Sequence, residues 1–403
     1  MLWSEASNGQ PIEAMLDQID FLRLSMRRHP DPATVYKQEV VNPDLQIRGA
    51  WKKVIVNSDV KPSARCAFSS WAWGGRMYIL GGCGINVQND DMWYVFFLRM
   101  RIKQCPHSGA SRCLDFKTLK WRQLPNLPIS NVNELPRAVW IVKLWEDTAV
   151  FFTGQPDFIC TFDLVNEKWV KKNTRMKGKQ EWPYKNIFVH EYCAEVLEGI
   201  LYIFGGNDHN TSLGTNVLLA LDLTTFVWDH ISGTSDNIPQ AFEPNVRRLA
   251  QMWADPEQRK LYLLYGNAGL ASALLYEKEH GFDTDYPYED FWSFDIVQLK
   301  WTRERRGGNY PCPRSEAAVV YSPQLKATVV YGGYNASLCT SVYVREKVVF
   351  AYSFFGDAFI FDSKTKRWKH VITRGFPSYR ALAQLTVDPD TGKIYLYGGK
   401  HLM

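Results

Sequence analysis

One short pattern occurs six times in this chain and restricts the folds that it can adopt. Each copy is a turn, then about five apolar residues, then a glycine that ends the run, as in GGRMYILGGCG at residues 74–84. A short apolar run between turn residues is typical of a strand that is buried on both faces. Glycine suits the end of such a strand because it enters positive-φ conformations freely and lets another backbone come close. The other copies span residues 145–155, 198–208, 259–269, 325–335 and 391–401.

A second pattern follows the first five copies. It is an aromatic-rich strand that ends in an aspartate, with a tryptophan six residues further on. The aspartate can bond to its own backbone in a tight turn. The tryptophan supplies a large apolar surface at the start of the next strand. The pairs are Asp115 and Trp121, Asp163 and Trp169, Asp222 and Trp228, Asp295 and Trp301, and Asp362 and Trp368.

A third pattern, a basic residue near a proline, precedes each glycine-ended strand. The complete unit therefore contains four strands and repeats at a period of roughly 50 residues, which is typical of a propeller blade. The unit resembles the kelch repeat, whose marks are the double glycine, the aspartate turn and the terminal tryptophan. The resemblance covers about residues 37–403. It implies an all-β fold, a six-bladed kelch-type β-propeller with four-stranded blades and the glycine-rich strand second in each blade.

Two copies depart from the double glycine. Blade two has Thr153–Gly154 and blade four has Gly266–Asn267 in its place, so we expect altered turns there within the same fold.

The two ends of the chain carry complementary parts of a blade. Trp51 has no glycine-rich strand before it, and the last glycine-rich strand has no tryptophan after it. We therefore predict one propeller over residues 36–403, whose last blade takes its inner strands from residues 380–399 and its outer strands from about 36–41 and 50–56. Sharing a blade between the ends would leave no open strand edge. The alternative is that a longer parent chain completes the blade.

Residues 1–35 are predicted to form an N-terminal helical extension. Residues 12–26 place Ile12, Met15, Leu16, Ile19, Leu22 and Met26 on one helical stripe. This short helix either packs on the propeller or docks to a partner.

Three insertions interrupt the repeat. Residues 96–114 separate Asp91–Val95 from Asp115, and they are either a loop or translated sequence that is ordinarily absent. Blades four and five carry long loops at residues 267–289 and 334–355.

The basic residues of the third pattern form one candidate site. Equivalent positions in a closed ring would surround the mouth of a central channel and favour an acidic or phosphorylated ligand. The alternative is that each one bonds to neighbouring blade backbone. The six residues are Arg65, Arg137, Lys185, Arg247, Arg314 and Arg380.

A second candidate is the basic linker at residues 169–185, which we expect on the same face as the long loops. It is either a solvated loop or a recognition surface, because loops on a rigid scaffold often carry binding. Its candidate binding residues are Lys171, Lys172, Arg175 and Lys177.

Several classes of function find no support in the sequence. The eight cysteines include no CxxC pair, the eight histidines show no ligand or triad spacing, and we predict neither a metal nor a cofactor. A net charge of +5 over 403 residues is too small to indicate nucleic acid. No run of about 18 apolar residues could span a membrane, and the first 30 residues lack a signal-peptide core. We expect a cytoplasmic protein that can also enter the nucleus.

The sequence thus predicts a scaffold or adaptor without enzymatic activity. It would bind a protein partner, through an acidic or phosphorylated segment, on the loop face of the propeller. The alternative is a propeller enzyme similar to galactose oxidase that acts on a small molecule. Such an enzyme would need metal ligands or acid–base residues that converge at the channel mouth.

Overall fold

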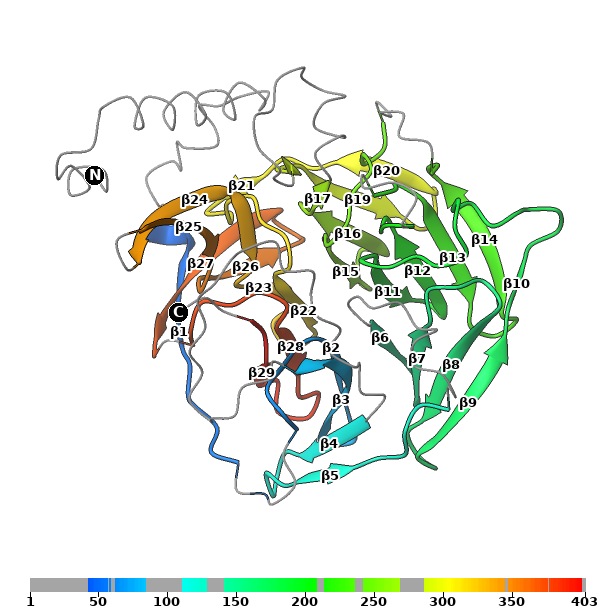
Figure 1. Ribbon diagram of the computed structural model, residues 1–403, viewed down its shortest axis with the longest axis horizontal. Helices are drawn as coiled ribbons and strands as arrows, with labels where there is room; N and C mark the ends of the chain where they lie inside the picture. The colour runs from blue at the N-terminus through cyan, green and yellow to red at the C-terminus, as the bar shows by residue number, and fades with distance from the viewer. Residues whose placement is uncertain are drawn as a thin grey trace.

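The computed structural model is a ring of β-sheets that are arranged around a central axis (Figure 1). It describes residues 43–56, 58, 62–84, 111–128, 141–208, 214–235, 242–268, 286–344, 347–375 and 377–400. The predicted N-terminal helix lies outside these residues. No helix in the described part of the chain is long and apolar enough to cross a membrane.

Five antiparallel four-stranded sheets follow one another along the chain and form blades one to five. Blades one to three are β2 (Arg65–Trp73), β3 (Arg76–Gly84), β4 (Ser111–Asp115) and β5 (Trp121–Gln123); β6 (Val142–Trp145), β7 (Thr148–Phe152), β8 (Phe158–Asp163) and β9 (Lys168–Asn173); and β11 (Cys193–Leu197), β12 (Ile200–Phe204), β13 (Leu218–Asp222) and β14 (Val227–Ser232). Blades four and five are β15 (Gln251–Asp255), β16 (Lys260–Leu264), β19 (Phe291–Asp295) and β20 (Lys300–Arg303); and β22 (Ala318–Ser322), β23 (Ala327–Tyr331), β26 (Ala358–Asp362) and β27 (Arg367–Arg374).

The sixth position in the ring holds a two-stranded sheet, β28 (Gln384–Val387) with β29 (Ile394–Tyr397). The innermost strands of successive blades contact one another, and β28 contacts both β22 and β2. The ring of inner strands is therefore closed. A complete four-stranded sixth blade is not seen in the described residues and stays a prediction.

The double glycine lies where two blades come close together. A Cβ atom at Gly205, where φ is 70°, would lie 2.5 Å from the carbonyl oxygen of Arg247 in the next blade. In blade four the equivalent pair is Tyr265–Gly266, with φ of 53° and 92°. The expected pair Gly266–Asn267 was therefore wrong by one residue. The signs of φ match those of the double glycines, so the expected altered turn is not found in this blade.

The aspartate turns have the predicted geometry. In each of the five, the carboxylate accepts hydrogen bonds from the backbone N–H groups two and three residues further on, as Asp222 does from Thr224 and Thr225. These bonds lower the pKa of Asp222, against the opposing effect of its slight burial. The turn sets the position of the tryptophan that follows.

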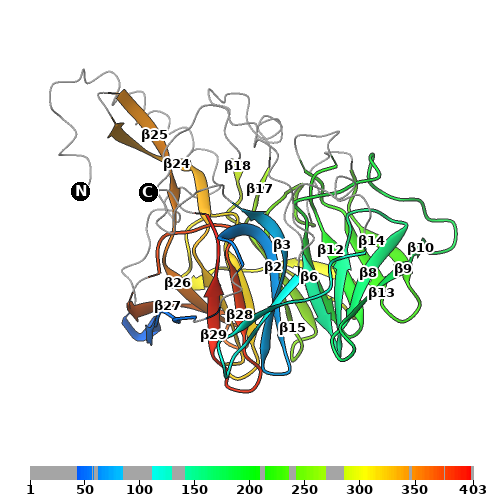
Figure 2. The ribbon, with the colours of Figure 1, turned by 60° about the horizontal axis from the view of Figure 1, so that its bottom comes forward.

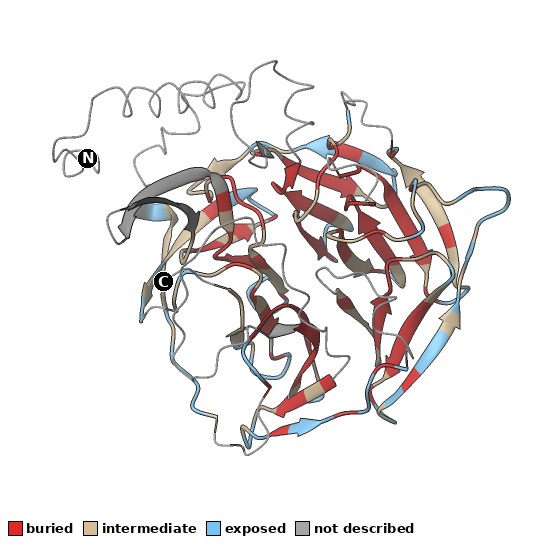
Figure 3. Cartoon of the chain, viewed as in Figure 1, coloured by how far each residue is buried: buried red, intermediate tan, exposed pale blue. Residues whose placement is uncertain are grey.

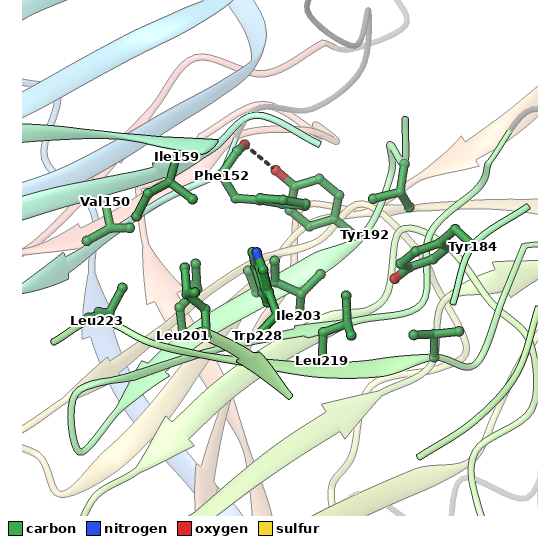
Figure 4. Close-up of a cluster of buried hydrophobic side chains, with 14 residues drawn as sticks. Val150, Phe152, Ile159, Tyr184, Tyr192, Leu201, Ile203, Leu219, Leu223 and Trp228 are labelled. Carbon is green, nitrogen blue, oxygen red and sulfur yellow. Dashed lines mark hydrogen bonds between the residues drawn. The ribbon is translucent and has the colours of Figure 1, made fainter. Parts of the chain in front are cut away.

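Each tryptophan packs against the preceding blade. Trp228 of blade three lies 5.2 Å, between ring centroids, from Phe152, which is the last residue of the second strand of blade two (Figure 4). Trp301 meets Phe204 at 5.2 Å, and Trp121 meets Tyr397 at 5.7 Å. Clusters of buried side chains consequently join adjacent sheets. Figure 3 shows that most of the blade strands are buried.

Trp51 makes the same contact. It lies 5.3 Å from Tyr331, the last residue of the second strand of blade five. The surroundings of Trp51 match those of Trp368 as well. A Cβ atom at Gly375 would lie 2.5 Å from the carbonyl oxygen of Trp51, and a Cβ atom at Gly308 would lie 2.5 Å from the carbonyl oxygen of Trp368. Trp51 therefore occupies the tryptophan position of a sixth blade.

The strands expected around Trp51 are different. Residues 46–50 form β1 (Gln46–Ala50), which follows the 3₁₀ turn η1 (Pro43–Leu45) and pairs in parallel with β27 of blade five. Residues 51–56 form no strand, so the predicted outer strand at 50–56 is wrong. The other predicted outer strand, residues 36–41, lies outside the described residues.

The third strand of blade one also corrects the sequence analysis. The insertion was placed at residues 96–114, but β4 contains Ser111–Asp115 and pairs with β3 through Met77–Leu114 and Tyr78–Cys113. The last four residues of the assumed insertion are thus part of the blade, and their removal would delete most of this strand.

Short strands complete the sheets. The linkers between blades add β10 (Arg175–Met176) to β14 and β21 (Gly307–Gly308) to β27, both in parallel. The long loops of blades four and five form two hairpins, β17 (Asn267–Ala268) with β18 (Tyr286–Pro287) and β24 (Tyr334–Val344) with β25 (Lys347–Phe354).

If Trp51 holds blades five and six together, Trp51→Ala will lower the free energy of unfolding by about 2 kcal/mol or more, since a large aromatic side chain leaves a partly buried site. Denaturant unfolding measures this change. Ile55→Ala in the same linker, where the side chain is 81% exposed, is the control and is expected to stay within about 0.5 kcal/mol of wild type. Equal effects of the two substitutions would contradict the packing role of Trp51.

Candidate interaction surface on the loop face

Two hairpins from adjacent blades rise from one face of the ring. These are β17–β18 of blade four and β24–β25 of blade five, and Figure 2 shows both above the blades, on the side away from the aspartate turns. Strand β18 contacts β24, so the hairpins lie side by side. We call this side the loop face. Within the described residues, β24–β25 is the longest strand pair on this face.

Buried arginines hold the bases of both hairpins. The side chain of Arg314 is fully buried and donates two hydrogen bonds, of 2.5 and 3.1 Å, to the carboxylate of Asp357 at the end of the second hairpin loop. It also donates to the carbonyl of Gly332 and lies 4.0 Å from the ring centroid of Phe355. One guanidinium thus ties together both ends of the blade-five loop.

Arg247 repeats this arrangement in blade four. Its side chain is fully buried and bonds to Asp290 at 2.6 and 2.7 Å, and to the carbonyl of Tyr265 at 2.9 Å. The ring of Tyr288 lies 4.1 Å away. Burial by itself raises the pKa of Asp290, but the charge and hydrogen bonds of Arg247 outweigh it and keep that pKa below its usual value. The carboxylate therefore stays ionised where it meets the guanidinium.

The structure places the arginines of the predicted basic ring against blade backbone. Arg65 and Arg380 also direct their guanidinium groups to blade backbone, at Gly81 and Gly398. In blade three, His190 forms a backbone bridge with Asn207, and in blade four Arg248 forms the same bridge with Asn267. His190 is therefore equivalent to Arg248, and Val189 is equivalent to Arg247. Lys185 is exposed but outside this series, and Arg137 lies outside the described residues. The geometry fits the alternative in which the arginines bond to their own blades.

A group of polar residues that the sequence analysis missed lies next to this series, at the loop-face end of the inner strands. Ion pairs cross between blades, from Arg248 to Glu191 at 2.9 Å and from Lys400 to Glu316 at 3.0 Å. The side-chain amide of Asn267 donates to the hydroxyl of Ser315. The polar residues therefore come from blades three to six. We call this group the axial cluster; it comprises Glu191, Arg248, Asn267, Ser315, Glu316 and Lys400.

The backbone fixes the axial cluster in place. The N–H of Leu249 donates to the carbonyl of Glu191, Glu316 donates to Leu249, and Leu382 donates to Glu316. Ala67 then donates to Leu382, so the series continues from blade six into blade one. All five residues have φ between 53° and 58°. Only their position in the repeat could have identified these five residues from the sequence, since each one lies two residues after the basic residue of its blade or the equivalent of that residue.

The basic linker lies on the outer edge of the ring, and not with the long loops as expected. Lys171 and Lys172 belong to β9, the outermost strand of blade two, and Arg175 belongs to β10 beside blade three (Figure 1). The ammonium of Lys171 lies 3.7 Å from the ring centroid of Phe158, and Lys177 pairs with Asp229. We call Lys171, Lys172, Arg175 and Lys177 the basic rim.

The structure also bears on metal chemistry. Over the described ranges of the chain, no three histidine, cysteine, aspartate or glutamate side chains form a group that could hold a metal ion.

Comparisons with known proteins identify one family. The family model described as the KLHDC2/KLHL20/DRC7 Kelch-repeats domain matches residues 141–399, which is more than half of the chain. No curated protein matches the sequence.

Breaking one buried pair tests whether it anchors the loop face. Asp290→Asn leaves Arg247 as a buried charge without its carboxylate and is expected to lower the free energy of unfolding at pH 7 by about 3–5 kcal/mol. The pKa of Asp290 is lower in the folded protein than in the unfolded chain. Ionised Asp290 therefore contributes fully to the free energy of unfolding above the unfolded pKa of about 3.9, and this contribution is lost as the pH falls through the folded pKa. The variant should therefore lose less stability than wild type over that acidic range.

Denaturant unfolding at several pH values measures both effects, with Asp390→Asn at an exposed aspartate as the control. Wild-type stability and an unchanged pH dependence in Asp290→Asn would show that the pair does not anchor the blade.

Proposed function

Because this chain belongs to the kelch-repeat family that the KLHDC2/KLHL20/DRC7 model describes, we propose that it binds another protein through its loop face. Propellers of this kind are typically interaction domains. The binding surface consists of the β17–β18 and β24–β25 hairpins together with the axial cluster. The chain acts as a scaffold or adaptor for that partner.

The observation that carries this proposal is the way in which the hairpins are mounted. Each leaves a rigid blade at a turn whose two ends share one buried guanidinium, that of Arg247 or Arg314. Loops that a rigid scaffold holds in place are preferred sites of binding, because little order has to be gained when the partner arrives.

The chemistry of the partner is suggested by the charges. The axial cluster carries acidic and basic groups in pairs, so it favours a polar segment rather than a strongly charged one. The basic rim is different, because Lys171 and Arg175 are exposed and belong to a chain of net charge +5. We propose that an acidic or phosphorylated region of the partner approaches along this rim while another segment docks on the loop face.

Binding kinetics separate these two contributions. A partner captured from native lysate by the full chain is purified and measured against two double variants. Lys171→Glu with Arg175→Glu is expected to lower the association rate by about tenfold at low salt with little change in dissociation, because rim charges steer the encounter. Raising the salt to about 0.5 M should remove most of this difference.

Arg248→Ala with Lys400→Ala is expected to raise the dissociation rate, since these side chains lie on the docking surface itself. The matched control is Lys117→Glu with Lys120→Glu, which makes the same charge change as the rim variant at two exposed lysines in the aspartate turn of blade one. The loop face would be ruled out if the measured rates changed neither with salt nor in either test variant. It would also be ruled out if the control variant changed the rates as strongly as the test variants.

A further inference from the structure

The outer edge of blade five gathers positive charge from three separate parts of the chain. These are residues 43–53, which contain β1, the linker residues 302–309, and residues 364–374, which contain β27. Eleven of these 30 residues are lysine or arginine and two are aspartate or glutamate, which is a balance of +9. Since the whole chain has a net charge of +5, all its other residues together balance to −4. The excess of positive charge therefore comes from this one region.

The three segments are in direct contact. Strand β1 pairs with the last five residues of β27, and β21 of the linker pairs with the first two. A Cβ atom at Gly307 in β21 would lie 3.9 Å from Cγ of Arg367. The side-chain amide of Asn309, at the end of the linker, donates to the carbonyl of Leu45 at 3.1 Å. Charges that are far apart in the sequence thus share one sheet edge.

Most of these charges are not neutralised within the protein. Lys366 pairs with Glu304 at 2.7 Å, and Lys364 pairs with Glu257 of blade four at 3.1 Å. Seven further basic side chains are exposed and form no ion pair with any residue that the structure describes. We call these seven residues the blade-five edge; they are Arg48, Lys52, Lys53, Arg303, Arg305, Arg367 and Arg374.

The blade-five edge has basic residues on both faces of its sheet. Successive residues of a strand point to opposite faces. Arg374 and Arg48 share the face of Trp368, which packs against blade four. Arg367 shares the other face with Val371, which packs on the opposite side of the blade. A ligand has to bend around the sheet edge to meet both groups, so a flexible chain fits this surface and a flat lipid bilayer does not.

We propose that the blade-five edge binds an acidic, flexible segment of a partner protein. Five of its seven residues are arginines, and the planar guanidinium group pairs with carboxylates through two parallel hydrogen bonds. Single-stranded nucleic acid is also flexible and anionic, but proteins hold it largely by stacking its bases on exposed aromatic rings. In the three segments, Trp51 is half-buried and Trp368 is fully buried. The observations therefore favour carboxylates on a polypeptide.

This surface is separate from the basic rim. Figure 1 shows β1 and β27 on one side of the ring and β9 and β10 on the opposite side. A segment that binds to the blade-five edge therefore leaves the basic rim accessible. The inference does not rest on the proposed function, because none of the seven residues belongs to the axial cluster or to the two hairpins.

Binding of a labelled peptide to the full chain tests the proposal. The probe is a peptide of alternating glutamate and serine, measured by fluorescence anisotropy at low salt. The triple variant Arg48→Glu, Arg303→Glu and Arg374→Glu is expected to weaken binding at least about tenfold, because attractive charges become repulsive. Raising the salt to about 0.5 M should weaken binding to wild type in the same direction. If the triple variant is insoluble, Arg48→Gln with Arg374→Gln is used, with the same expected direction.

The matched control is Lys117→Glu with Lys120→Glu and Lys168→Glu, which makes the same charge change at three exposed lysines of blades one and two. It should bind the peptide within about twofold of wild type, because salt screens charges that lie further away than the Debye length. An equal loss in this control, or unchanged binding in a soluble triple variant, would overturn the proposal.

Two other probes decide the class of the ligand. An oligothymidylate and vesicles that contain anionic lipid are measured in the same way, and both are expected to bind more weakly than the peptide. Tighter binding of either one would overturn the proposal in favour of nucleic acid or a membrane surface. Arg248→Ala with Lys400→Ala, which tests the loop face, should bind the peptide as wild type does. Failure of this proposal and failure of the proposed function are therefore distinguishable.

Discussion

The close approach of each blade to the next is the constraint on which the rest of the structure depends. The N–H of the second glycine donates to the carbonyl of the basic residue in the following blade, from Gly206 to Arg247, from Gly333 to Arg380 and from Gly399 to Arg65, each at 2.9 Å. A side chain on the preceding glycine would collide with that same carbonyl. Glycine therefore suits this joint between blades, although blade four makes the same joint with Tyr265 in the first position. Hydrophobic clusters fill the space between the sheets that the joint connects.

The arginines complete this joint from the other side. The backbone carbonyl of Arg314 accepts a bond from Gly266 in blade four, while its side chain bonds to Gly332 in its own blade. One residue thus connects two blades and also the base of a hairpin. A buried ion pair of this type contributes little net stability compared with a well-packed apolar pair, but it restricts the arrangements that its partners can adopt. We therefore regard Arg247 and Arg314 as residues that position the loop face and not as residues that touch a ligand.

The elements that sequence reasoning predicted well are those whose signal is local. The aspartate turns depend on hydrogen bonds within three residues, and all five have the expected form, which places a tryptophan six residues after each aspartate. Errors arose where a pattern had to be placed in register without a partner strand. Lys185 was selected in blade three because it follows a proline, but the backbone bridge between His190 and Asn207 shows that Val189 holds that position.

The same limitation explains why the axial cluster could not be predicted from the sequence. The ion pairs Arg248–Glu191 and Lys400–Glu316 join residues that are far apart in the sequence, and only the closed ring brings them together. The basic rim was visible as composition, but its place on the outer edge follows from the pairing of β9 and β10 with their sheets. Charge in a linker gives no information about the face on which it lies.

The ties around the axis do not depend on the outer part of blade six. Two contacts of blade six do not involve residues 36–56 at all. Lys400 pairs with Glu316 of blade five, and the N–H of Ala67 in blade one donates to Leu382. Both lie at the loop-face end of the inner strands, so the axis is closed whether or not the outer part of blade six is filled. The axial cluster, which we propose for partner binding, is therefore held by contacts near the axis and not by the outer part of blade six.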